Sequence, residues 1–165
     1  MLFRSSVAPL DYSRFLLEIL NRWITLDDES VKITEIESII KAFLGQEVRN
    51  CMFMGECNKY FTIYPNGAVY GCDSLPQIEK FYFGNVMSGL DAIFTTDNFH
   101  NFCRINQNIR KKCQKCKWFF ICHGGCLQDY YPSYLDMGSK NLFCPGLQEI
   151  YKEIEKILKK YNLIN

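Results

Sequence analysis

Apolar positions recur with helical period at both ends of the chain. Near the N-terminus two such stripes predict helices that each bury one face; they comprise Phe15, Leu16, Ile19, Leu20 and Trp23, then Ile36, Ile39, Ile40, Phe43 and Leu44. Val31-Lys-Ile33, between the stripes, predicts a short strand. A last helix is expected from Pro145, with a stripe of Leu147, Ile150, Tyr151, Ile154, Leu158 and Tyr161. All three helical faces need a partner.

The middle of the chain has the shorter period of strands. Residues 60–64 and 68–72 are strand-like runs, and Pro65-Asn66-Gly67 joins them. An Asn-Gly pair between two such runs is a strong hairpin signal. A further extended piece and two short helices are expected at 81–86, 90–94 and 99–105. The pattern predicts an α+β fold: a small β-hairpin module with two cysteine-rich loops, flanked by helices at both ends.

Composition narrows the class of protein. The 165 residues fit one modest domain, or one domain with a helical attachment, and a net charge of +1 gives no argument for a nucleic-acid or membrane partner. We find no apolar run of transmembrane length, and the start lacks the pattern of a signal peptide. Nine cysteines are therefore expected in a reducing cytoplasm, where they act as metal ligands more often than as disulfides.

Four of the cysteines crowd into fourteen residues. Cys113, Cys116, Cys122 and Cys126 have the spacing C-x2-C-x5-C-x3-C, and Cys144 follows after seventeen more residues. Two glycines between the last pair of the motif let backbone approach a metal centre and donate N–H groups to its sulfurs. Such a loop suits an iron–sulfur cluster better than a packed core.

The hairpin gathers further cysteines. Cys51 and Cys57 precede it with the spacing C-x5-C, and Cys72 ends its second strand. Folding the hairpin brings Cys57 towards the end that holds Cys72. The ninth cysteine, Cys103, lies among aromatic residues of a helical stretch and is interpreted as a small buried hydrophobe.

Eight cysteines then remain, which is two sets of four. Two 4Fe–4S cubanes and two four-cysteine zinc sites both require that number. The x5 and x3 spacings and the single-cysteine arms suit zinc less well, so spacing favours iron–sulfur and leaves zinc as the alternative.

The whole arrangement resembles a known module. Cys57-x9-Gly67-x4-Cys72, then Cys113 to Cys126, then Cys144 is similar to the seven-cysteine signature of the SPASM domain, the auxiliary-cluster module of radical S-adenosylmethionine (SAM) enzymes that modify peptides and proteins. Cys51 resembles the extra ligand of members such as the anaerobic sulfatase-maturating enzymes.

The resemblance implies which cysteines act together. Cys51, Cys57, Cys72 and Cys126 would hold a first auxiliary 4Fe–4S cluster, and Cys113, Cys116, Cys122 and Cys144 would hold a second. Spacing alone would instead group Cys113 to Cys126 as one set. Asp73 corresponds to the position at which sulfatase-maturating relatives place the proton acceptor, although it would equally serve to cap the strand exit.

The chain departs from the family in one respect. A radical SAM enzyme binds its catalytic cluster through C-x3-C-x2-C, but Asp129 stands where the third cysteine after Cys122 and Cys126 would be. The fifty residues before Cys51 are also too few for a barrel, which usually needs about 200. By itself this stretch is not expected to cleave S-adenosylmethionine, so S-adenosylmethionine and a third cluster belong only to a full-length enzyme.

Two main interpretations follow, and an interaction domain stapled by zinc is a third, less favoured one. The favoured one is the electron-transferring, peptide-binding part of a radical SAM maturase, an oxidoreductase whose barrel partner is present in cis or in trans. The other is a free-standing iron–sulfur electron-transfer module. The expected organisation is a helix–strand–helix linker at 1–50, a SPASM domain at 51–145 and a C-terminal helix at 146–165.

Overall fold

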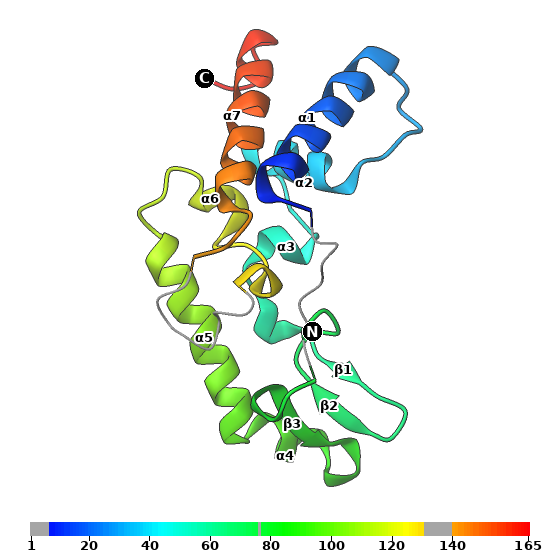
Figure 1. Cartoon of the computed structure of the whole chain (residues 1–165), viewed down its shortest axis with the longest axis vertical. Coiled ribbons are helices and arrows are strands. Elements are labelled where there is room, and N and C mark those ends of the chain that lie inside the picture. The colour runs from blue at the N-terminus through cyan, green and yellow to red at the C-terminus, as the bar shows by residue number, and fades with distance from the viewer. Residues whose placement is uncertain (1–6, 76, 131–139) are drawn as a thin grey trace.

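The computed structural model describes residues 7–75, 77–130 and 140–165. Figure 1 shows an elongated molecule with a helical end and a sheet end, joined by a middle in which the chain passes several times from one end to the other.

The helical end is built around two long helices that lie together. They are α1 (Pro9–Leu26) and α7 (Cys144–Lys160), and α2 (Thr34–Phe43) packs beside them with the short α3 (Cys51–Met54) and α6 (Phe119–Cys122). Their apolar stripes form one core, which includes Leu16, Leu20, Ile36, Ile39, Trp118, Ile150, Tyr151 and Ile154. The stripes predicted from helical period are thus the faces that meet.

Three residues of those stripes lie outside the core. Phe15 is 59% exposed, Tyr161 is 57% exposed and Leu44 is 39% exposed. Phe15 precedes the buried Leu16, and one residue turns a helix by about 100°, so its side chain leaves the contact face. Tyr161 follows the last residue of α7, beyond the part of the helix that α1 covers.

The sheet end contains the predicted hairpin and one strand more. β1 (Thr62–Ile63), β2 (Ala68–Tyr70) and β3 (Tyr82–Asn85) form an antiparallel sheet in that order. Gly67 has a φ of +79° in the hairpin turn, and its N–H donates to the Tyr64 carbonyl over 2.8 Å. The Asn85 side chain donates to the Asn66 carbonyl over 2.9 Å and so fixes the turn against β3.

Two helices cover this sheet. α4 (Leu90–Phe94) has the bounds that the pattern predicts, whereas α5 (Asp97–Cys113) is much longer than residues 99–105. The Thr96 hydroxyl accepts from the Phe99 N–H at the start of α5, and three basic residues fill its last turn, where they favour the helix dipole. The core here includes Val69, Leu75, Phe81, Phe83, Ile93, Phe102, Leu127 and Tyr130.

Three other expectations differ from the structure. Residues 31–33 form no strand, because no other described segment pairs with them. The cysteine stretches predicted as loops contain short helical turns, namely α3, α6 and the 3-10 turn η1 (Cys57–Lys59). Cys103 is partly exposed in α5 rather than buried. The α+β class is confirmed, and the extended piece expected at 81–86 forms the third strand, β3.

Among the described helices, none is long and apolar enough to cross a lipid bilayer.

Candidate metal centre

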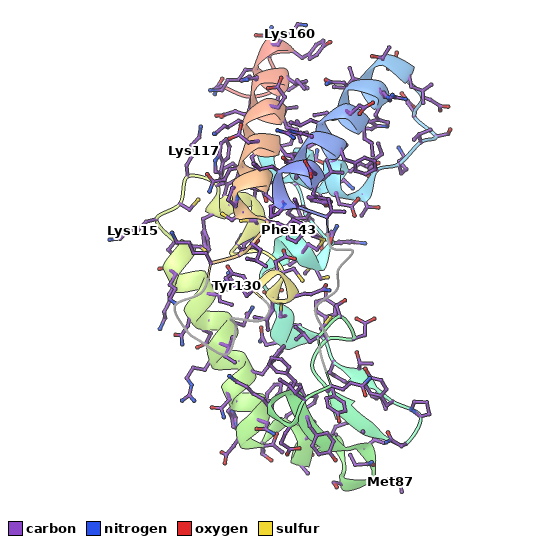
Figure 2. All side chains as sticks on the ribbon, viewed as in Figure 1. Met87, Lys115, Lys117, Tyr130, Phe143 and Lys160 are labelled. Atoms are coloured by element: carbon purple, nitrogen blue, oxygen red, sulfur yellow. The ribbon has the colours of Figure 1, made fainter. Side chains whose placement is uncertain are left out.

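The cysteines lie in the middle of the molecule, between the two cores. Cys57 and Cys72 pack against the core of the sheet end, whereas Cys116 and Cys122 pack against the core of the helical end. Figure 2 places Tyr130 and Phe143, which neighbour these segments, between the two ends. A metal site in this middle layer would therefore take thiol ligands from both the helical end and the sheet end.

The first thiol group combines both cysteines of the C-x5-C pair with two distant ones. Burial raises the pKa of the Cys57 thiol, the Leu127 N–H lowers it, and the nearby Cys72 and Cys51 raise it further. Burial raises the pKa of Cys126 to about 12, and Cys57 and Cys72 are among the neighbours that add to the shift. In this first group, Cys57 therefore lies near Cys51 and Cys72, and Cys126 lies near Cys57 and Cys72.

The second thiol group comes from α5, α6 and α7. Burial raises the pKa of Cys113, with further increases from the neighbouring Cys144 and Cys116. The pKa of Cys122 is raised by burial and, in part, by Cys113 and Cys144. In this second group, Cys113 thus lies near Cys116 and Cys144, and Cys122 lies near Cys113 and Cys144.

Hydrogen-bond donors surround these sulfurs. Backbone N–H groups lower the thiol pKa values of four cysteines: Leu127 acts on Cys57, Ser74 on Cys72, Gln128 on Cys126 and Gly124 on Cys122. The Gln148 side chain donates to the Cys144 sulfur over 3.2 Å. Such donors stabilise thiolate, the form in which cysteine binds a metal.

The residues fit two four-thiolate clusters. Within the part of the chain that the structure describes, no three His, Cys, Asp or Glu side chains are close enough to hold one metal ion between them. A 4Fe–4S cluster instead binds each thiolate through a separate iron, so that its ligands surround a larger body. Two sets of four thiols match that requirement, and all of these thiols except the exposed Cys51 are partly buried.

Two side chains tie the first group to the second, a role that the sequence did not reveal. The His123 Nδ1 lies 2.7 Å from the Phe53 carbonyl oxygen, and Arg110 donates to the Gly55 carbonyl over 3.1 Å. His123 has a φ of +49°, which turns the chain between Cys122 and Cys126. The imidazole therefore connects the segment after Cys122 to α3.

Asp73 lies at the edge of the first group. It is exposed, and its Oδ1 accepts from the Cys72 thiol over 3.3 Å and from the Ser74 hydroxyl over 3.5 Å. Among the aromatic residues between Cys116 and Cys122, Trp118 is buried, whereas Phe120 is 47% exposed.

Three polar side chains near the second thiol group were not predicted from the sequence. The Tyr130 hydroxyl donates to the Gly124 carbonyl over 2.8 Å and lies beside Cys113. Gln148 and Tyr151 follow Cys144 by four and seven residues, which places them on the same side of α7. That spacing was the signal that could have identified the last two.

Comparison with known proteins defines the class of this site. Residues 51–117 match the SPASM family of iron–sulfur cluster-binding domains. The chain therefore carries a SPASM iron–sulfur domain.

Its relatives are sulfatase-maturating enzymes. The chain is 26% identical over 153 residues to the cysteine-type anaerobic sulfatase-maturating enzyme of Clostridium perfringens, a match that covers 91% of this chain and 41% of the relative. It is 22% identical to the serine-type enzyme of Klebsiella aerogenes, over 92% of this chain and 36% of the relative. The chain thus spans about two fifths of the length of these curated relatives.

Solved structures agree with this relationship. Native anSMEcpe with bound AdoMet superposes with a TM-score of 0.81 at 26% identity, over 98% of this chain and 44% of the other. The same enzyme with bound AdoMet and Cp18Cys peptide gives a TM-score of 0.80 at 26% identity, over 100% of this chain and 46% of the other.

Proposed function

We propose that this chain is the two-cluster auxiliary domain of a radical SAM enzyme that matures a peptide or protein. The proposal is supported by the SPASM match over residues 51–117, by the proximity of Cys126 to Cys57 and Cys72, and by that of Cys113 and Cys122 to Cys144. Cys51, Cys57, Cys72 and Cys126 hold the first 4Fe–4S cluster, and Cys113, Cys116, Cys122 and Cys144 hold the second. The domain then spans residues 51–145, beyond the matched part.

Full ligation by cysteine determines what the clusters supply. A cubane with four thiolates offers no open iron to a substrate, so it supplies electron transfer when bound. The chain's own residues hold the thiolates, donate hydrogen bonds to them and keep water away, with Trp118 and Phe53 buried on the side of the helical end.

The remaining parts of the reaction lie outside this stretch. Relatives more than twice as long bind AdoMet, and one structure of anSMEcpe also holds a peptide. We infer that a barrel supplies S-adenosylmethionine cleavage and a third cluster. Residues 1–50 would link this barrel to the SPASM domain, and residues 146–165 would follow the domain as a C-terminal helix. Exposed apolar side chains on α1, such as Leu10 and Phe15, suit contact with that barrel.

Asp73 is proposed as the proton acceptor for the peptide substrate. Its carboxylate is exposed beside Cys72, within reach of a substrate bound at the first cluster. In the complete enzyme, Asp73→Asn should lower peptide oxidation by about 100-fold or more, because acid–base groups contribute about that much. Iron content should not change, and Asp91→Asn on α4 is the matched control. Equal activity of the two variants would assign Asp73 only a structural role.

Metal analysis tests the proposal itself. Anaerobic reconstitution should give about eight iron and eight sulfide per chain, with a brown absorbance that reduction bleaches. About two zinc per chain, with no colour, would refute it and leave a structural module held by four-thiolate zinc sites.

A further inference from the structure

One side of α7 directs polar groups at the second thiol group. Cys144, Gln148 and Tyr151 are separated by four and then three residues, so they share one side of the helix. Gln148 already donates to the Cys144 sulfur over 3.2 Å. Tyr151 belongs to the buried core of the helical end, and Cys116 and Cys122 of the second thiol group pack against that core.

Among the described residues, the Tyr151 hydroxyl is a buried polar group that lacks a hydrogen-bond partner. The side chain is 1% exposed and its ring packs against Trp118, with 5.7 Å between the ring centroids. The hydroxyl oxygen has no hydrogen-bond partner of acceptable geometry among the described groups. The Cys122 thiol lies close enough for the hydroxyl to lower its pKa, so the two groups are neighbours whose hydrogen bond is not closed in this arrangement.

An unpartnered buried hydroxyl is costly, and phenylalanine would fill the same space without that cost. A tyrosine here therefore needs an acceptor. A thiolate is a far stronger acceptor than a thiol, because hydrogen bonds to charged groups are about twice as strong as neutral ones. Cys122 becomes such an acceptor when it binds iron.

We propose that Tyr151 donates a hydrogen bond to the Cys122 thiolate at the second cluster and raises the reduction potential of that cluster. The inference rests on the proposed function, in which Cys122 is an iron ligand. Reduction adds one electron, and a donor at sulfur stabilises the more negative reduced form more than the oxidised form.

Tyr130 is a weaker candidate for the same role. Its hydroxyl also lowers the pKa of a thiol of the second group, Cys113, but it already donates to the Gly124 carbonyl over 2.8 Å. The first thiol group receives backbone N–H donors from Leu127, Ser74 and Gln128 instead. A change at Tyr151 should therefore affect the second cluster and leave the first as an internal reference.

The test is a redox titration of the reconstituted chain, with Tyr151→Phe as the variant. Tyr161→Phe is the matched control, since it removes a hydroxyl that is exposed at the end of the same helix. EPR follows the two clusters separately. In Y151F the reduced-to-oxidised ratio of the second cluster should fall about tenfold at a given potential, which is about 59 mV for one electron. The first cluster and Y161F should match the wild type.

A second readout is independent of potential. Pulsed EPR in D2O should detect an exchangeable deuteron coupled to the second cluster of the wild type and of Y161F that is missing from Y151F. Full iron content with unchanged potentials and an unchanged deuteron signal in Y151F would overturn the inference. A wild-type chain that takes up no iron would instead overturn the proposed function.

Discussion

At the scale of single residues, the chemistry of this chain depends on thiols that burial keeps protonated. The pKa of Cys126 is raised to about 12, and those of Cys57, Cys113 and Cys122 are also raised, in each case mainly by burial. Iron must displace these protons, because only thiolate is a ligand. In the proposed assignment, Cys122 of α6 and Cys126 of the turn that follows bind different clusters.

Serine variants test that assignment. Cys122→Ser should lose the second cluster and Cys126→Ser the first, so each should retain about four iron per chain. The double variant should retain almost none. Iron and sulfide analysis with EPR provides the measurement. Cys103→Ser is the control and should keep about eight, since Cys103 belongs to neither thiol group. If the double variant kept about four iron, Cys122 and Cys126 would share one cluster.

At the scale of elements, the helical end depends on the close approach of α1 and α7. Gly146 is buried in the first turn of α7, and a Cβ there would overlap the Pro9 carbonyl oxygen and meet Ser13 Cβ at 3.1 Å. Pro9 begins α1, so the two helix starts are in contact. Cys144 begins α7, and the contact therefore also sets the position of one proposed iron ligand.

Gly146→Ala should separate these helix starts. Overpacking of this kind costs about 1–3 kcal/mol, so the free energy of unfolding of the reconstituted chain should fall by that amount in denaturant titration. Lys160→Ala, at the exposed end of α7, should change it by less than about 0.5 kcal/mol. Equal stability of the two variants would mean that α1 moves aside without cost.

At the scale of the whole molecule, two cores are joined through the cysteine layer. Cys113 comes from the end of α5, a helix of the sheet end, but groups with thiols of the helical end. Cys126 follows the helical turn α6 but groups with Cys57 and Cys72 of the sheet end. Each proposed cluster would therefore link both ends of the molecule.

Removal of iron should uncouple the two ends. With a chelator and an oxidant, hydrogen exchange should become faster in residues 113–127, and the single unfolding transition of the loaded chain should move to lower temperature and broaden or split. Return of iron and sulfide should reverse the change. A metal-free chain with the same exchange and the same transition would show that the cores hold together without the clusters.

Much of the fold was predictable from local pattern. Asn66-Gly67 predicted the hairpin because a tight turn requires positive φ, and Gly67 adopts it. Leu16, Leu20, Ile36 and Ile150 were predicted as core because helical period places them on one face. The missing strand at 31–33 and the full length of α5 depended on which segments lie alongside, and local pattern carries no such information.

The sequence by itself determined the helical faces, the hairpin, the α+β class and the eight cysteines as candidate metal ligands, because residue type and spacing act locally. Tertiary structure decided the contacts. It placed Cys126 beside Cys57 and Cys72, set His123 against the Phe53 carbonyl and buried the Tyr151 hydroxyl beside Cys122. These contacts join residues that lie far apart in the chain, and only the packing of the two cores brings them within reach.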